Sequence, residues 1–120
     1  MNTLTVINDA ATILATTGKP VHIAALLHVD ADGRLELPDD PAAFVLHLIT
    51  GTPNHEWGQT TYGTVRLQVD AWSSTPGEAL SMLQAAEPLL AASKWIPGVL
   101  RDLGRDGQWS GAAQDFERGT

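Results

Sequence analysis

Four histidines are the residues of this sequence that most readily suggest catalysis or metal binding. They are His22, His28, His47 and His55, and the last is followed by Glu56. His22 and His28 would share one face of a straight strand at a separation of about 20 Å. Metal ligands must converge much more closely, and no HExxH or other known ligand spacing is present. We therefore expect surface or edge histidines, with no metal site and no cofactor.

The other motifs that could carry chemistry are incomplete. The turn Asp30-Ala31-Asp32-Gly33 resembles the start of a calcium loop, but Arg34 stands where the third ligand belongs and no closing glutamate follows. The serines lack a G-x-S-x-G elbow, and the glycines form neither G-x-G-x-x-G nor a phosphate loop. We expect a hairpin turn at 30–33, no catalytic residues, and a protein that is not an enzyme.

The charge composition of the chain limits the kinds of molecule that it is expected to bind. The 120 residues include 14 acidic and 7 basic side chains, which give a net charge of −7, and no cysteine. A chain this acidic is repelled by phosphate backbones, so specific nucleic-acid binding is not expected. The start MNTLTVINDA lacks the basic residues of a signal peptide, and no apolar run is long enough to span a membrane. We expect a soluble protein made in the cytoplasm.

Tryptophan is over-represented among the aromatic residues. Four tryptophans accompany one tyrosine and two phenylalanines. Trp57 falls in a polar segment, and Trp72 falls on the face of its predicted strand opposite the apolar row. Exposed tryptophans often anchor interfaces, so both are candidate contact residues. For Trp72, burial under a second helix is the alternative.

A strand that runs into a capped helix is the clearest structural signal. Between residues 65 and 72, Val65, Leu67, Val69 and Ala71 alternate with polar or aromatic residues, which is the period of a half-buried β-strand. The segment Thr75-Pro76-Gly77-Glu78 then matches a capping box. The helix that follows has apolar residues at helical spacing, and Pro88 predicts a kink or an end near Glu87.

The remaining elements complete the predicted fold. Apolar spacing predicts a first helix over 3–16, and β-forming residues predict strands over 21–30, 34–37 and 43–50. The segment 51–61 is expected to be a polar loop. The fold class is therefore α/β (α+β): a small, mostly antiparallel sheet of about four strands packed against two helices. The expected order is α-β-β-β-β-α with a possible C-terminal strand.

One domain accounts for the chain. We expect it to span residues 1–103. The glycine-rich, polar segment 104–120 is expected to be a flexible or partner-ordered C-terminal tail.

The segment VRLQVDAWSSTPGEALSML, residues 65–83, resembles the tail-terminator or tail-completion proteins of long-tailed bacteriophages. In that family a strand of the type V-x-V-D-x-W/Y-S runs into a helix rich in alanine and leucine. The strand over 43–50 and the opening helix are also in place, so the resemblance covers residues 4–103. The usual closing strand of the family is weak in this sequence.

The resemblance implies a virion structural protein. Such a subunit forms a homo-oligomeric ring, usually a hexamer, that caps the head-proximal end of the tail tube, stops its polymerisation and presents a head–tail joining surface. The implied partners are further copies of the chain, the tail tube protein and a head-completion or neck protein. DNA would pass through an acidic lumen without specific binding.

The expected contacts lie in the polar segment and on the exposed strand face. The candidate interface residues are Asn54, His55, Glu56, Trp57, Arg66, Asp70 and Trp72, with Arg66 and Asp70 expected in polar pairs between subunits. The alternatives are another head–tail connector or minor tail protein, or a small acidic binding module of the antitoxin or immunity type. The last alternative is an enzyme that uses histidines with Asp or Glu.

Overall fold

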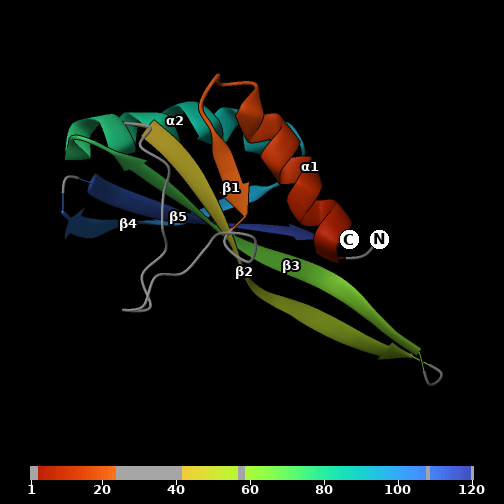
Figure 1. Ribbon diagram of the computed structural model, residues 1–120. Coiled ribbons are helices and arrows are strands. Elements are labelled where there is room, and N and C mark those ends of the chain that lie inside the picture. Colours follow the sequence, from red (N-terminus) through yellow and green to blue (C-terminus); the bar gives the residue numbers. More distant parts are fainter. Residues whose placement is uncertain (1–2, 24–41, 57–58, 108, 120) are drawn as a thin grey trace.

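The computed structural model describes residues 3–23, 42–56, 59–107 and 109–119. They form α1 (Thr3–Ala15), β1 (Val21–Ile23), β2 (Ala42–Glu56), β3 (Gln59–Ser73), α2 (Pro76–Ala91), β4 (Ile96–Asp106) and β5 (Trp109–Gly119) (Figure 1). The five strands make one sheet in the order β1-β2-β3-β5-β4. Only β1 and β2 are parallel neighbours. The predicted class, a mostly antiparallel sheet packed against two helices, is confirmed, with one strand more than expected.

Both helices cover the same face of the sheet (Figure 1). The alternation in β3 explains which face is covered, because Val65, Leu67 and Val69 all point to the helix side and are fully buried. The helices contribute apolar residues at helical spacing, and the strands contribute alternate residues. The resulting core includes Val6, Leu14, Phe44, Leu46, Leu83, Leu90, Trp95 and Phe116.

Helix α2 begins as predicted and ends later than predicted. The Thr75 side chain accepts a hydrogen bond from the backbone N–H of Glu78 at 3.2 Å, which is the N-cap bond of the capping box. The alternative of a helix end near Glu87 is wrong, because the helix runs through Pro88 to Ala91. Pro88 lies in the last turn and is exposed, so its missing N–H removes a single bond close to the helix end.

The N-terminal half agrees with the predicted elements where it is described. Helix α1 ends one residue earlier than expected, and Gly18 follows with a φ of 83°, a conformation that glycine adopts without strain. Strand β1 confirms the start of the expected strand over 21–30. The remainder of that strand, the turn at 30–33 and the strand over 34–37 lie outside the described residues.

The C-terminal segment is part of the sheet, so the predicted tail over 104–120 is wrong. Residues 104–106 end β4, and β5 lies between β3 and β4, paired with both. Phe116 on β5 is buried in the core. Two strands therefore follow α2, where the predicted order placed only a possible one.

A close contact between β3 and β5 explains the glycine at position 111. Trp72 and Gly111 are register partners, and a Cβ atom built on Gly111 would lie 2.5 Å from Cζ3 of Trp72. The indole ring thus occupies the space that a side chain at position 111 would need. Ala112 and Ala113 follow and are both buried.

We expect Gly111→Ala to lower the free energy of unfolding by about 1–3 kcal/mol, because the ring of Trp72 must shift to admit the methyl group. Urea unfolding measures this loss. Gly77→Ala is the matched control, since a Cβ at this helical position meets nothing within 4 Å and alanine favours helix. An unchanged midpoint for Gly111→Ala would show that the ring is not held in place.

Strands β2 and β3 continue as a two-stranded arm beyond the part of the sheet that the helices cover (Figure 1). The arm comprises residues 51–56 of β2 and 59–63 of β3, and the pairing extends to Glu56 opposite Gln59. The expected polar loop over 51–61 is therefore wrong. Backbone hydrogen bonds between the two strands sustain the arm after the apolar alternation has ended.

Candidate functional site

The face of the sheet opposite the helices carries a polar network that begins with a buried carboxylate. Asp70 on β3 is only 4% exposed, and its register neighbours are Val45 on β2 and Ala113 on β5. Its Oδ2 atom lies 2.8 Å from Nε2 of His47 on β2, and its Oδ1 atom accepts from Nε2 of Gln68 at 2.7 Å. Both carboxylate oxygens thus have a partner, as a buried charge requires.

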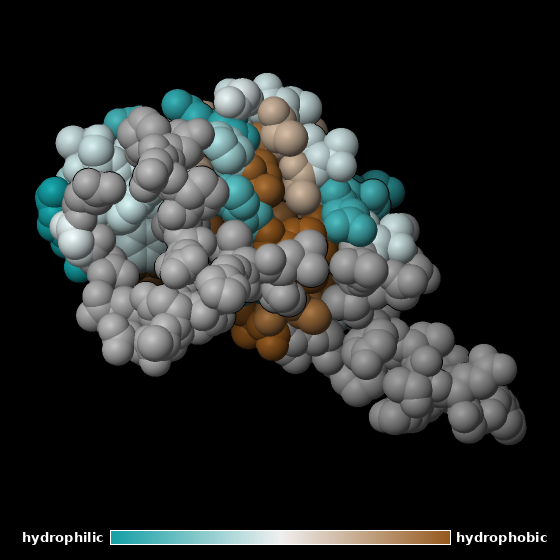
Figure 2. All heavy atoms as spheres, in the orientation of Figure 1, coloured by the Kyte–Doolittle hydropathy of each residue, from teal (hydrophilic) through white to brown (hydrophobic). Residues whose placement is uncertain are grey.

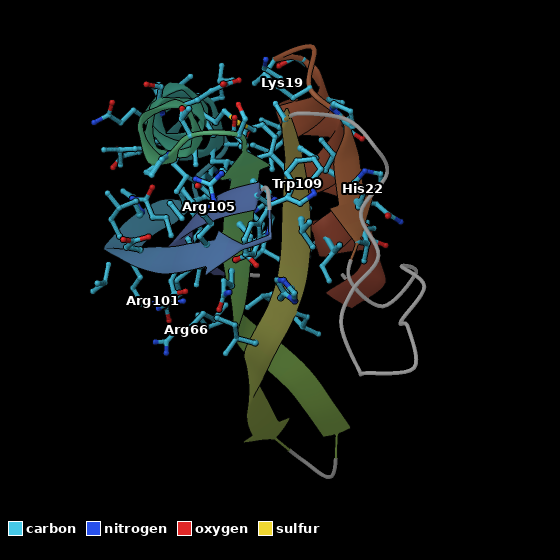
Figure 3. All side chains as sticks on the ribbon, turned by 60° about the vertical axis from the view of Figure 1, so that its left-hand side comes forward. Lys19, His22, Arg66, Arg101, Arg105 and Trp109 are labelled. Atoms are coloured by element: carbon cyan, nitrogen blue, oxygen red, sulfur yellow. The ribbon has the colours of Figure 1, made fainter. Side chains whose placement is uncertain are left out.

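The network continues through Gln68 to the far strand of the sheet. Arg101 on β4 donates to Oε1 of Gln68 at 2.9 Å and makes two hydrogen bonds with Asp115 on β5, at 2.9 and 3.1 Å. The hydrogen bonds to Asp115, helped by its negative charge, raise the pKa of the Arg101 guanidinium above its usual value. Figure 3 shows Arg101 and Arg66 on the part of the sheet away from α2.

This network links strands across the sheet. It joins β2, β3, β5 and β4 through side chains with matched donors and acceptors, which rigidifies a sheet. Among the residues that the structure describes, no group of three or more His, Cys, Asp or Glu could hold a metal ion.

The structure places the predicted interface residues in two regions. Asp70 is engaged inside the subunit, as described above, whereas Arg66 is exposed and lies opposite Glu117 in the register. Trp72 is half-buried against Gly111. These three residues are on the face opposite the helices, as the alternation predicted.

The remaining predicted contact residues belong to the arm and its tip. Asn54, His55 and Glu56 are the last three residues of β2, paired with Thr61, Thr60 and Gln59 of β3. Their backbone positions are described and their side chains are not. Trp57 lies outside the described residues. The role of these four residues in contacts between subunits stays a prediction.

The structure describes the side chains of two histidines, His22 and His47. His22 is on β1, opposite Val45 of β2 in the register, and its Nε2 atom is buried without a hydrogen-bond partner. His28 and the side chain of His55 lie outside the described part of the chain. Of the two described histidines, His47 is the one that the structure connects to a carboxylate.

Sequence reasoning missed an apolar surface on the outer strand β4. Ile96 is 66% exposed and Val99 is 68% exposed, and Leu100 and Leu103 are exposed as well. In the described part of the chain, no strand pairs with β4 on the side away from β5. We call this side the β4 edge. The apolar run Ile96 to Leu100 is the signal that was available in the sequence.

A shallow hollow adjoins the β4 edge. It has a volume of about 230 Å³ and is lined by Ile96, Pro97, Val99 and Phe116, with Arg66 and the acidic residues 115 and 117 also in its wall. An apolar floor with charged residues around it is the usual composition of a protein contact site.

The opposite end of the sheet has a second unpaired side. Strand β1 pairs with β2 only from Phe44 to Leu46, so within the described ranges the outer side of β2 from His47 to Glu56 has no strand beside it. We call this side the β2 edge. Leu48 and Ile49 are exposed at its beginning, and Figure 2 shows apolar atoms on the surface beside the point where the arm leaves the sheet.

A larger hollow lies at the ends of the two helices, away from both edges. Its volume is about 470 Å³, and its lining includes Asp9 and Thr12 of α1, Lys94 after α2, and Arg118 of β5. The mixture of one acidic and two basic residues selects no single charge of ligand. The two edges are therefore the stronger candidate site.

Neither helix of the described chain is long and apolar enough to cross a membrane. In comparisons with known proteins, no family model and no curated protein matches this chain. The candidate functional site therefore rests on the geometry of the chain itself: a five-stranded sheet in which β2 and β4 expose apolar residues and are linked by a polar network that runs through β3 and β5.

Proposed function

We propose that this chain is a tail terminator, a virion structural protein that works as a homo-oligomeric ring at the head-proximal end of a phage tail tube. The observation that carries the proposal is that, in the described part of the sheet, β4 and the part of β2 beyond its pairing with β1 each have an unpaired side and expose apolar residues. Such edges are sites for pairing with another chain, and a subunit built for assembly has a use for both.

The resemblance of residues 65–83 to the tail-terminator family supports the same function. These residues form the later part of β3, which is the central strand of the sheet, and the first half of α2. The arm supports the proposal independently, because a two-stranded ribbon outside the core is marginally stable alone and gains from a neighbour. The tail tube protein and a head-completion or neck protein are the proposed further partners.

The acidity of the chain suits a ring through which DNA passes. A net charge of −7 on each subunit gives the assembled ring a strongly negative potential, which opposes adhesion of a phosphate backbone. In this proposal DNA crosses the lumen without specific binding, the subunit needs no cofactor, and the chain performs no catalysis.

The first test is the mass of the purified protein by size-exclusion chromatography with light scattering. We expect a discrete species near six times 12.8 kDa. The second test adds this species to a polymerising tail tube protein of the same phage, where we expect shorter tubes, each with a ring at one end. A ring that leaves tube length unchanged would contradict the terminator function.

A small acidic binding module is the second candidate, and the β4 edge is the observation that favours it. A single exposed edge with an adjacent hollow can accept one extended segment of a basic partner. A monomeric mass at high concentration, with tube growth unaffected, is the result expected for this function. Another head–tail connector or minor tail protein would form a ring without stopping tube growth.

A further inference from the structure

We infer that the β4 edge of one subunit pairs with the β2 edge of the next copy, so that one sheet continues from subunit to subunit around the ring. This inference rests on the proposed function for the ring and assigns the surfaces that form it. The occupant of each edge is thus a second copy of this chain.

Strand direction is the first argument. Along the sheet, β2 runs opposite to β3, β3 opposite to β5, and β5 opposite to β4. Strand β4 therefore runs opposite to β2. A second copy placed beside the first in the same orientation brings its β2 next to β4 in antiparallel pairing, with the helices of both copies on the same face. Antiparallel pairing is the more stable arrangement for two adjacent strands.

Length is the second argument. The β4 edge spans residues 96–106, and the β2 edge spans residues 47–56, so the two free stretches are nearly equal. Within the described residues, β1 pairs with β2 only as far as Leu46. In the proposed junction, the incoming β4 strand lies along β2 beyond that residue.

The positions of the exposed apolar residues are the third argument. Each edge has an irregularity in its pairing with its own neighbour, between Leu48 and Thr50 on β2 and between Asp102 and Gly104 on β4. The residues left out of register are Ile49 on β2 and Leu103 on β4. Bulges redirect side chains and bend a strand edge. An antiparallel ladder that pairs residues 47–56 with residues 96–105 places Ile49 opposite Leu103. Both are exposed in the subunit, and contact between them would remove apolar surface from water on both sides.

Two different surfaces make the contact head-to-tail. Such a heterologous contact leaves one unpaired edge at each end of any open chain of subunits, and closure into a ring satisfies both. Pairing of β4 with β4 of a second copy about a two-fold axis is the competing arrangement. It would produce a dimer and leave both β2 edges unpaired.

Cysteine cross-linking tests the junction directly, because the natural chain has no cysteine. The double variant Ile49→Cys with Leu103→Cys, treated with a short bismaleimide, should give a ladder of covalent multiples that ends at the mass of the ring. Each single variant should stay uncross-linked. The matched control is Leu89→Cys with Leu103→Cys, since Leu89 is equally apolar and similarly exposed but lies on α2; this pair should not cross-link.

A charge placed at the junction provides a second readout. Val99→Lys should raise the protein concentration at which half of the subunits are assembled by at least about tenfold, because burial of the valine is lost and an ammonium must be desolvated. Leu89→Lys should leave that concentration unchanged. Circular dichroism should show both variants folded, because both positions are exposed in the subunit.

The outcomes separate the junction from the function. A ring of full mass without cross-links in the double variant would overturn the junction and leave the terminator proposal intact. Cross-linked dimers from Leu103→Cys alone would overturn it in favour of two-fold pairing. A cross-linked ring that fails to stop tube growth would confirm the junction and remove the terminator function.

Discussion

Removal of residues 107–120 should give a chain that does not fold. Strand β5 pairs with β3 at ten positions, from Thr64 opposite Gly119 to Ser73 opposite Ser110, and it is the strand that holds β4 in the sheet. Its loss removes Phe116 from the core and separates β4 from β3. Loss of one buried phenylalanine side chain alone costs about 3–5 kcal/mol, which is a large part of the about 5–15 kcal/mol that stabilises a typical domain.

Far-UV circular dichroism and urea unfolding of the truncated chain measure this effect. We expect no cooperative transition. Removal of Thr120 alone is the control, since β5 ends at Gly119, and it should leave the midpoint unchanged. A truncated chain that unfolds cooperatively at the wild-type midpoint would mean that the segment is a dispensable tail, as its composition first suggested.

Local patterns predicted the centre of the fold well. The alternation in β3 and the capping box of α2 each involve residues only a few positions apart. Both patterns can therefore be recognised in the sequence without knowledge of the fold. The side of β3 that faces the helices followed from the same alternation, and so did the placement of Arg66, Asp70 and Trp72 on the opposite side.

Long-range packing explains the elements that were missed. Strand β5 contains Gly111 because the ring of Trp72, on a strand distant in sequence, fills the adjacent space. The run of small residues in β5 therefore predicts a polar tail unless its packing against Trp72 of β3 is known. The arm was missed for a different reason: backbone pairing continues past Ile49, where the apolar pattern stops.

The candidate site also depends on register. Asp70 was predicted to pair between subunits, but its actual partner His47 is 23 positions away on β2. The bond between Arg101 and Gln68 joins residues 33 positions apart. No periodicity within one segment indicates such pairs. The β2 and β4 edges likewise became visible only when the strand order showed which strands lie at the ends of the sheet.

Replacement of Gln68 by glutamate should be the most damaging single substitution on the face opposite the helices. The amide of Gln68 donates to Asp70 through Nε2 and accepts from Arg101 through Oε1. Glutamate keeps the acceptor, removes the donor and places a second carboxylate beside one that is already buried. We expect a loss of about 2–4 kcal/mol in the free energy of unfolding at pH 7. Gln84→Glu, the same change at an exposed position of α2, should alter it by less than about 0.5 kcal/mol.

The penalty of Gln68→Glu should depend on pH in a known direction. Repulsion from the neighbouring carboxylate raises the pKa of the introduced glutamate in the folded variant above its value in the unfolded chain, so the variant is least stable at neutral pH and recovers as the pH falls toward about 4. Urea unfolding at a series of pH values measures this, and an equal penalty at all of them would contradict the role of Gln68 as a donor to Asp70.

The Gln68→Glu variant also tests whether the polar network supports assembly of the subunits. Because Gln68 links the strand pair that carries the β2 edge to the pair that carries the β4 edge, loosening it should lower the mass measured by light scattering before the subunit unfolds.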